Sequence, residues 1–290
     1  MGFIGSETRK CSLKLDMTNK PYRGRIAPSP TGLLHLGHAK TFWSAYQRCE
    51  EAGGKLIYRD EDIDPHRCKD VFSIAAQEDL HRLGIRWDKG PIKQSERISF
   101  YADALKELAR GGFVYPCHHS RKVINNHPMT IKSDHEESIF PVALRNPIQP
   151  TTHPLSLDTN WRFRVPDADS IGFIDKNLGK QAFDTMKDFG DFLVWRKEGV
   201  PAYELAVVVD DAAMGITEVV RGEDLLVSTA RQLLLYSALN LNPPSFFHET
   251  LVLDECGARL AKRNDSLSLR TLFEQGHDFE SLEQLWSSRS

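Results

Sequence analysis

The sequence is poor in the features of a secreted or membrane-bound protein. Its 290 residues include only five cysteines, an odd number scattered along the chain, which does not resemble a disulfide-stapled domain. No apolar run approaches the roughly 20 residues that a membrane-spanning helix needs, and the start of the chain has no apolar segment of signal-peptide length. We therefore expect reduced thiols and a cytoplasmic protein without membrane contacts.

The chain also lacks a basic excess. The formal net charge is -3 and the pI is about 6.4, so a globally cationic nucleic-acid binder is excluded and any RNA contact must use a local patch. Hydrophobic residues make up 40% and charged residues 27%, which is typical of a globular protein with one substantial domain and an insertion. There is no repeat, low-complexity tract or long heptad pattern.

Regular patterns begin at Tyr22. RGRIAP predicts a strand, SPTG a turn, and LGHAKTFWSAYQRCEEAGG an amphipathic helix that ends at Gly53 and Gly54. KLIYRDEDID then predicts a second strand running into an acidic loop, and VFSIAAQEDLHRLGI a second helix. This alternation of strand and helix indicates a parallel sheet with crossover helices.

Regular patterns fade between residues 116 and 160 and then resume. WRFRV and FGDFLVWRKEG predict strands, YELAVVVDDAAMGITEVVRG predicts a buried strand, a turn and a strand, and DLLVSTARQLLLYSALNL predicts a helix capped by Ser228. The predicted divisions are a disordered N-terminal extension (1–21), two halves of a catalytic domain (22–115 and 191–248), an inserted subdomain (116–190) and a C-terminal segment (249–290).

The turn between the first strand and the first helix carries two histidines. It reads RIAPSPTGLLHLGH, residues 25–38. Small residues such as Gly37 let a backbone approach phosphates, and a helix N-terminus attracts anions. The spacing of His35 and His38 puts both rings on one face near that end, where they can donate hydrogen bonds to a nucleotide α-phosphate. Two histidines at this spacing alone would more often mark an ordinary surface turn, but the whole string favours a phosphate site.

This string resembles the "HIGH" signature of class I aminoacyl-tRNA synthetases, in the form of the glutamate-specific branch. The resemblance covers roughly residues 22–272. It implies an α/β fold, a class I synthetase Rossmann-like parallel sheet with an inserted acceptor-binding-type subdomain. It also implies that His35, Gly37 and His38 bind ATP and that the two histidines act in catalysis.

A carboxylate cluster, YRDEDID (58–64), follows the second predicted strand. Without context it would be a solvated acidic loop, but ligands of open parallel sheets lie beyond the carboxyl ends of strands. It resembles the family segment whose carboxylate binds the substrate α-ammonium, a role that maps onto Glu61. Arg25 and Ser29 match family residues that contact glutamate, and an arginine fork suits a carboxylate.

The segment from Gly199 to Asp224 resembles another part of the family's amino-acid pocket. Tyr203 and Arg221 correspond to residues that line it. A cationic Arg221 would favour glutamate over glutamine, because glutamine would leave its charge unpaired. Glu223, which follows directly, is assigned to ATP binding by the same resemblance.

RLAKRN (259–264) resembles the second class I signature, whose lysine stabilises the ATP phosphates and the departing pyrophosphate. Alone it is a common surface pattern. Arginine replaces the first lysine of the family form and Ala261 replaces its serine. Lys262 remains as the catalytic lysine and Arg263 as a further ATP ligand, so we expect activation to survive.

The resemblance is closer to truncated paralogues, the glutamyl-queuosine tRNA(Asp) synthetases, than to full glutamyl synthetases. The chain ends 27 residues after Arg263, which predicts that no anticodon-binding domain follows. The implied activity is formation of glutamyl-adenylate from L-glutamate and ATP, with Mg²⁺, and transfer of glutamate to the queuosine base of tRNA(Asp). We expect a monomer.

Many of these paralogues hold zinc through four positions in the insertion. Their equivalents here are Cys117, His119, Phe140 and Leu144. Two of the four cannot ligate a metal. His118, His127 or His135 could replace them, but we predict that zinc is absent.

Two other functions stay open. One is a truncated glutamyl-tRNA synthetase that uses another acceptor, which queuosine dependence would distinguish. The other is a non-catalytic RNA-binding or regulatory paralogue, suggested by the altered RLAKR segment and the lost zinc ligands. Retention of the pocket residues together argues against the latter.

Overall fold

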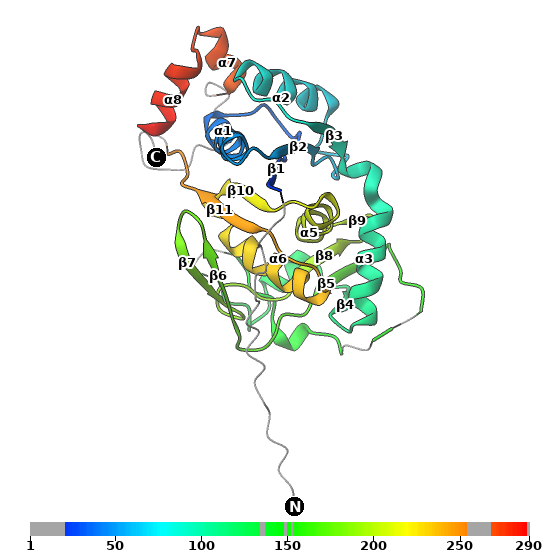
Figure 1. The fold of residues 1–290 in the computed structure, drawn as a ribbon. Helices are drawn as coiled ribbons and strands as arrows, with labels where there is room; N and C mark the ends of the chain where they lie inside the picture. Colours follow the sequence, from blue (N-terminus) through cyan, green and yellow to red (C-terminus); the bar gives the residue numbers. More distant parts are fainter. Residues whose placement is uncertain (1–20, 134–136, 148–149, 152, 254–267, 289–290) are drawn as a thin grey trace, which may run out of the picture.

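The computed structural model describes residues 21–133, 137–147, 150–151, 153–253 and 268–288 (Figure 1). The predicted extension lies almost entirely outside these residues. The strands are β1 (Arg23–Ile26), β2 (Lys55–Asp60), β3 (Lys89–Lys93), β4 (Val114–Cys117), β5 (Asn160–Phe163), β6 (Ser170–Asp175), β7 (Gly179–Asp184), β8 (Phe192–Arg196), β9 (Val200–Pro201), β10 (Glu218–Gly222) and β11 (Ser245–Glu249). The helices are α1 (Leu36–Glu51), α2 (Asp70–Arg82), α3 (Ile98–Arg110), α4 (Arg121–Asn125), α5 (Tyr203–Met214), α6 (Leu226–Ala238), α7 (Leu269–Glu274) and α8 (Phe279–Ser287).

The centre of the fold is parallel, as predicted. β1 pairs with β2 and β2 with β3, while β10 pairs with β11, all in parallel. β1 and β10 lie side by side and bring the two halves together, because the Thr217 N–H donates to the Arg23 carbonyl at 2.9 Å (Figure 1). This arrangement confirms the α/β class I fold and aligns the carboxyl ends of β1, β2 and β10 at one edge.

Successive side chains of β2 point to opposite faces of this sheet, and both faces are buried. Leu56 and Tyr58 pack into the cluster that contains α1, α2, α7 and α8. Ile57 points to the other face, where it packs with Met214 of α5 and Leu233 of α6. Since side chains alternate along a strand, Arg59 lies on the α5 side. This position matters for the ligand pocket.

The prediction of a buried strand at YELAVVV was wrong. Residues Tyr203–Met214 form α5, which ends at Gly215 in the left-handed conformation, with φ 66°. Eight of its twelve residues are buried, so the helix shows little amphipathic period and its valines resemble a core strand. The second half of the prediction was correct, since β10 follows.

The predicted cap of the next helix was also wrong. α6 begins at Leu226, and Ser228 lies inside its first turn rather than at its start. A short 3-10 helix over Glu223–Leu225 runs directly into α6, so no side-chain cap is used. α1 agrees better with its prediction, because it ends at Glu51 and Gly53 follows with φ 55°.

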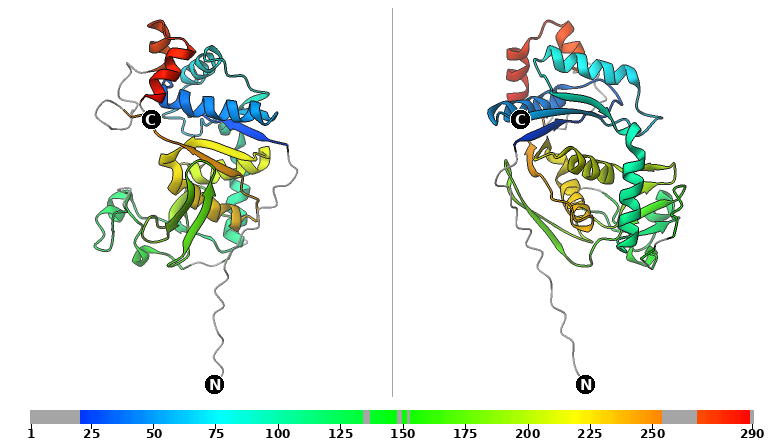
Figure 2. Two further views of the ribbon diagram at one scale, coloured as in Figure 1. Left: turned by 60° about the vertical axis from the view of Figure 1, so that its left-hand side comes forward. Right: turned by 45° about the vertical axis from the view of Figure 1, so that its right-hand side comes forward.

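The middle of the chain forms two antiparallel units. β4, β5, β8 and β9 make one sheet, so strands from both sides of the proposed boundary at 190/191 belong together. β6 and β7 form a hairpin that joins the central sheet through a parallel contact between Asp175 and Phe246 of β11. This hairpin lies beside α6 and β11 (Figures 1 and 2). In the described part of the chain, no helix is long and apolar enough to span a membrane.

Candidate active site

Five segments meet at one pocket of about 400 Å³ at the carboxyl edge of the central sheet. They are the end of β1 with the β1–α1 loop and the start of α1, the loop after β2, the start of α5, the end of β10 with the turn that follows it, and the loop after β11. The pocket brings together eight of the residues predicted for ligand binding: Arg25, Ser29, His35, Gly37, His38, Glu61, Tyr203 and Arg221.

The two histidines are built into the start of α1. His35 is the N-cap, and its Nδ1 accepts the Gly37 N–H at 3.2 Å, while Nδ1 of His38 accepts the His35 N–H at 3.2 Å. Since each Nδ1 is an acceptor, a neutral ring carries its proton on Nε2 and can donate through that atom. The rings lie 3.7 Å apart between centroids. A Cβ at Gly37 would come within 3.2 Å of the His35 ring, so glycine keeps this cap in place.

A buried charge cluster supports the glutamate side of the pocket. Arg59 is fully buried and donates to Asp211 of α5 and to Glu61, at 3.0 Å in the second case. Arg25 also approaches Asp211, at 3.7 Å, and donates to the Val220 carbonyl at 2.9 Å. These contacts fix α5 against β1 and β2, because a buried charge needs its counter-charge close by.

The pKa shifts in this cluster reflect burial opposed by charge. Burial lowers the pKa of Arg25, although Asp211 opposes the shift. Burial also lowers the pKa of Arg59, but Asp211 and Glu61 outweigh it and hold that pKa above its usual value. Burial raises the pKa of Glu61 against the pull of Arg59 and Arg25. An ammonium ligand would favour the ionised form of Glu61.

Arg221 lies across the pocket, and its guanidinium is almost completely buried. Its Nη1 donates to the Tyr203 hydroxyl at 3.4 Å, Nη2 to the Thr229 hydroxyl at 2.7 Å, and Nε to Nε2 of His248 at 3.3 Å. All three partners are uncharged groups, so the cation is oriented without being neutralised. Such an arrangement can bind a carboxylate through charge-assisted hydrogen bonds.

The remaining predicted ATP ligands are Glu223, Lys262 and Arg263. Glu223 does not line the pocket, and its carboxylate instead accepts the Leu251 N–H at 2.9 Å. Its neighbour Asp224 does line the pocket. Lys262 and Arg263 lie outside the described residues, so their roles stay predictions.

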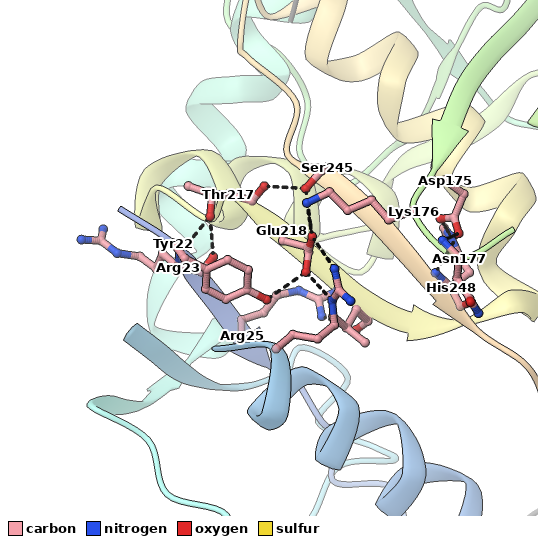
Figure 3. Close-up of polar contacts among 12 residues, drawn as sticks. Tyr22, Arg23, Arg25, Asp175, Lys176, Asn177, Thr217, Glu218, Ser245 and His248 are labelled. Carbon is pink, nitrogen blue, oxygen red and sulfur yellow. Dashed lines mark hydrogen bonds and ion pairs between the residues drawn. The ribbon is translucent and has the colours of Figure 1, made fainter. Parts of the chain in front are cut away.

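Sequence reasoning missed the residues that support the pocket from behind. Asp211 and Arg59 are buried charges inside apolar segments, and His248 occupies a buried position of the alternating strand β11. Asp175, at the end of β6, contacts His248 (Figure 3). A buried charged residue in a core strand or helix is a detectable signal, but its partners, more than 70 positions away, could not be inferred.

The positions equivalent to the family's zinc ligands form an apolar cluster. Cys117 and Phe140 are buried together with Tyr115 and Ile124, and Leu144 packs against them. His119 lines a separate hollow next to this cluster. The described residues contain no group of three or more side chains that could hold a metal, and His135 lies outside them. Because the Phe140 and Leu144 side chains carry no ligating atom, these four positions do not fit a tetrahedral zinc site.

Comparisons with known proteins agree with this geometry. Residues 22–285 match the family described as tRNA synthetases class I (E and Q), catalytic domain. The chain is 42% identical to the Glutamyl-Q tRNA(Asp) synthetase of Nitratidesulfovibrio vulgaris, over 88% of this chain and 82% of that protein. It is 43% identical to the protein of the same name from Symbiobacterium thermophilum, over 85% and 79%.

A solved structure supports the fold independently. It is a glutamate tRNA ligase from Elizabethkingia meningosepticum in complex with its amino acid, which is 27% identical and superposes with a TM-score of 0.70. The alignment covers 84% of this chain and 52% of that one, so the chain spans about half the length of that ligase. The chain belongs to the class I tRNA synthetase (E and Q) family and, within it, to the glutamyl-Q tRNA(Asp) synthetases.

Proposed function

We propose that this protein activates L-glutamate with ATP and transfers it to the queuosine base of tRNA(Asp). One observation supports this most directly. The residues predicted to bind glutamate line the same pocket as His35 and His38, the histidines at the start of α1 that are predicted to bind ATP. The relatives named Glutamyl-Q tRNA(Asp) synthetase indicate the acceptor. Retention of this pocket argues against a non-catalytic RNA-binding protein.

Glutamate binding follows from the charges of the pocket. Arg221 receives the side-chain carboxylate, because its guanidinium is held by uncharged partners. Glu61 receives the α-ammonium, while Arg25 and Ser29 contact the substrate from the β1 side. Tyr203 borders Arg221 and shapes the pocket. An uncharged glutamine side chain would leave Arg221 unpaired, which is a strong basis for discrimination.

Activation is an attack of the glutamate α-carboxylate on the α-phosphorus of ATP. The new oxygen–phosphorus bond forms as the bond to pyrophosphate breaks. His35 and His38 donate through Nε2 to the charge that develops on the α-phosphate, and Lys262 stabilises the departing pyrophosphate. The protein supplies no nucleophile, so positioning and electrostatics account for the rate.

Transfer uses the glutamyl-adenylate as the acyl donor. A hydroxyl of the queuosine cyclopentene-diol attacks the carbonyl carbon of the mixed anhydride. The ester bond forms, AMP leaves, and the hydroxyl proton passes to solvent or to the phosphate. A truncated glutamyl-tRNA synthetase would perform the same step on another acceptor.

Mg²⁺ balances the phosphate charge when it binds with ATP. Asp224, which lines the pocket, would supply a carboxylate to Mg²⁺ bound with ATP. We place this activity in a cytoplasmic monomer.

Glutamate-dependent exchange of pyrophosphate into ATP, without tRNA, tests the activation step. We expect exchange with glutamate and at least a hundredfold less with glutamine, since a site built for a polar group can reject an analogue that leaves that group unpaired by roughly 10⁴–10⁵. Absence of exchange under all conditions would contradict the proposal and favour the non-catalytic paralogue.

A further inference from the structure

Two arginines border the pocket, and their counter-charges differ. Arg25 lies 3.7 Å from the Asp211 carboxylate. Among the described residues, no carboxylate lies within ion-pair distance of Arg221, whose guanidinium donates hydrogen bonds to the His248 ring and two hydroxyls. Burying a cation without an adjacent anion is costly. The fold must therefore compensate Arg221 in a way that leaves its charge usable.

A buried carboxylate lies behind the His248 ring, in addition to the buried Glu204 carboxylate, which interacts electrostatically with Arg221. Asp175 Oδ2 lies 2.6 Å from Nδ1 of His248, and both side chains are fully buried (Figure 3). The other oxygen of Asp175 accepts three backbone N–H groups, those of Asn177, Leu178 and His248. An ionised carboxylate with four hydrogen bonds is firmly fixed, and it requires His248 to donate from Nδ1.

The tautomer of His248 then determines how Arg221 is held. With the proton on Nδ1, Nε2 carries a lone pair and accepts from Arg221 Nε at 3.3 Å, while the Thr229 hydroxyl lies 3.0 Å away. Asp175, His248 and Arg221 are thus an anion, a neutral ring and a cation in series. We call these three side chains the relay. Its net charge is zero, yet the guanidinium has no carboxylate in direct contact.

The protonation state agrees with this geometry. Burial lowers the pKa of His248 to about 4, and the nearby Arg221 and Arg25 cations also lower it, while Asp175 raises it. At neutral pH the ring is therefore uncharged. A protonated ring would lose its acceptor atom and repel Arg221.

The turn of the β6–β7 hairpin builds this relay. Asn177 Nδ2 donates to the His248 carbonyl at 2.8 Å, and the Lys176 N–H donates to the Phe246 carbonyl at 2.8 Å. Lys176 also reaches the buried Glu218 of β10 (Figure 3). Three consecutive residues of the hairpin therefore fasten β11 beside the strand that carries Arg221.

We propose that Asp175 and His248 are positioning residues that hold Arg221 through a neutral acceptor, so that its charge remains available to the side-chain carboxylate of glutamate. The proposal rests on the proposed function, because it assigns that carboxylate to Arg221. It predicts that His248 sets the preference for glutamate over glutamine without touching the substrate.

Two substitutions of His248 separate the roles of its nitrogens. His248→Gln places a neutral acceptor near the position of Nε2, whereas His248→Asn keeps a donor near Nδ1 and removes the acceptor for Arg221. In pyrophosphate exchange, we expect His248→Asn to raise the KM for glutamate about tenfold, with a smaller change in kcat, and to lower the glutamate-to-glutamine ratio of kcat/KM about tenfold. His248→Gln should stay within about threefold of the wild type. A tenfold change corresponds to the loss of one hydrogen bond to a charged group.

A purely structural role of His248 would give a different result. Both variants would then melt at lower temperature with an unchanged glutamate-to-glutamine ratio, and that result would overturn the proposal. If both variants fail to fold, Asp175→Asn decides, because an amide that donates to Nδ1 of His248 moves the ring proton to Nε2 and removes the acceptor for Arg221. An unchanged ratio in Asp175→Asn would then also overturn the proposal.

Exchange by the wild-type protein distinguishes failure of the role proposed for His248 from failure of the proposed function. Wild-type exchange with glutamate combined with an unchanged His248→Asn enzyme would refute the relay alone. No wild-type exchange would refute the proposed function itself.

The pH dependence of stability gives an independent readout. The pKa of His248 falls from its ordinary 6.5 to about 4 on folding, so the unfolded chain takes up the proton first. The stability from this group is fully present above pH 6.5 and is lost as the pH falls towards 4. The groups that face the ring are Asp175, Arg221 and Arg25. We expect the wild type to lose more stability than His248→Gln over this window, and parallel curves would contradict a neutral ring.

Discussion

The pocket and the apolar cluster at the zinc-equivalent positions are stabilised by different interactions, buried ion pairs in the pocket and apolar packing in the cluster. Beneath the pocket, a fully buried Arg59 is paired with Asp211 and Glu61. In the insertion, Cys117 and Phe140 pack with other apolar side chains. A buried ion cluster needs every partner, since removing one leaves an unpaired charge. An apolar cluster accepts any side chains of suitable size. Substitutions should therefore be tolerated less well in the pocket than in the insertion.

The largest effect should come from the lysine of the second signature. Lys262→Ala removes the cation assigned to the departing pyrophosphate, and loss of one such electrostatic contact lowers kcat about 10²–10³-fold. We expect this loss in pyrophosphate exchange with an unchanged melting temperature. Lys106→Ala is the control, because Lys106 is an exposed residue of α3. Equal activity of the two variants would remove Lys262 from the site.

The buried ion cluster should be the more fragile of the two regions. Asp211→Asn takes the counter-charge from Arg59 and Arg25, and breaking a buried pair typically costs about 3–5 kcal/mol of folding free energy. Urea unfolding measures this loss. Asp103→Asn, at an exposed position of α3, should change stability by less than about 0.5 kcal/mol. Similar losses for the two variants would show that the cluster contributes no special stability.

The apolar cluster should lose less. Phe140→Ala deletes a buried ring, for which about 3 kcal/mol is expected, at the lower end of the usual range because this small cluster can collapse around the gap. Exchange per folded molecule should be unchanged, since Phe140 does not line the ligand pocket. A selective loss of exchange in the folded variant would link the insertion to activation.

Chelation should have the smallest effect. Because Phe140 and Leu144 cannot ligate a metal, we expect EDTA or phenanthroline to leave the melting temperature within about one degree, whereas a structural zinc site contributes about 10 kcal/mol or more. Metal analysis of the purified protein accompanies the measurement. A large fall in melting temperature would show that the insertion holds a metal through other residues.

The residues that line the pocket could be predicted from the sequence, whereas the buried residues that hold them in place could not. The residues of the HIGH-like string, His35, Gly37 and His38, lie together at the pocket because a local motif forms a local helix cap. Tyr203 was assigned to the pocket although its element was taken as a strand, since the motif alignment does not depend on secondary structure. Arg221 was found, but its fixation by His248 and Asp175 depends on a hairpin that returns from a distant part of the chain. Such long-range partners have no periodic signal.

Errors in the predicted elements have a similar physical origin. α5 is buried on most sides, so tertiary packing rather than periodicity determines its helical state. At Ser228, a good capping residue lies within a helix that a 3-10 turn had already started. The assignment of Glu223 to ATP binding stays a prediction, and its carboxylate accepts the Leu251 N–H of the loop after β11.

A transfer experiment with defined tRNA acceptors identifies the acceptor of this protein. Radiolabelled glutamate, ATP and the protein are incubated with tRNA(Asp) that either carries or lacks queuosine, with tRNA(Glu) as the second acceptor. The account predicts label on queuosine-containing tRNA(Asp) alone. Label on tRNA(Glu), or equal label on tRNA(Asp) with and without queuosine, would contradict it and identify the protein as a glutamate ligase with another acceptor.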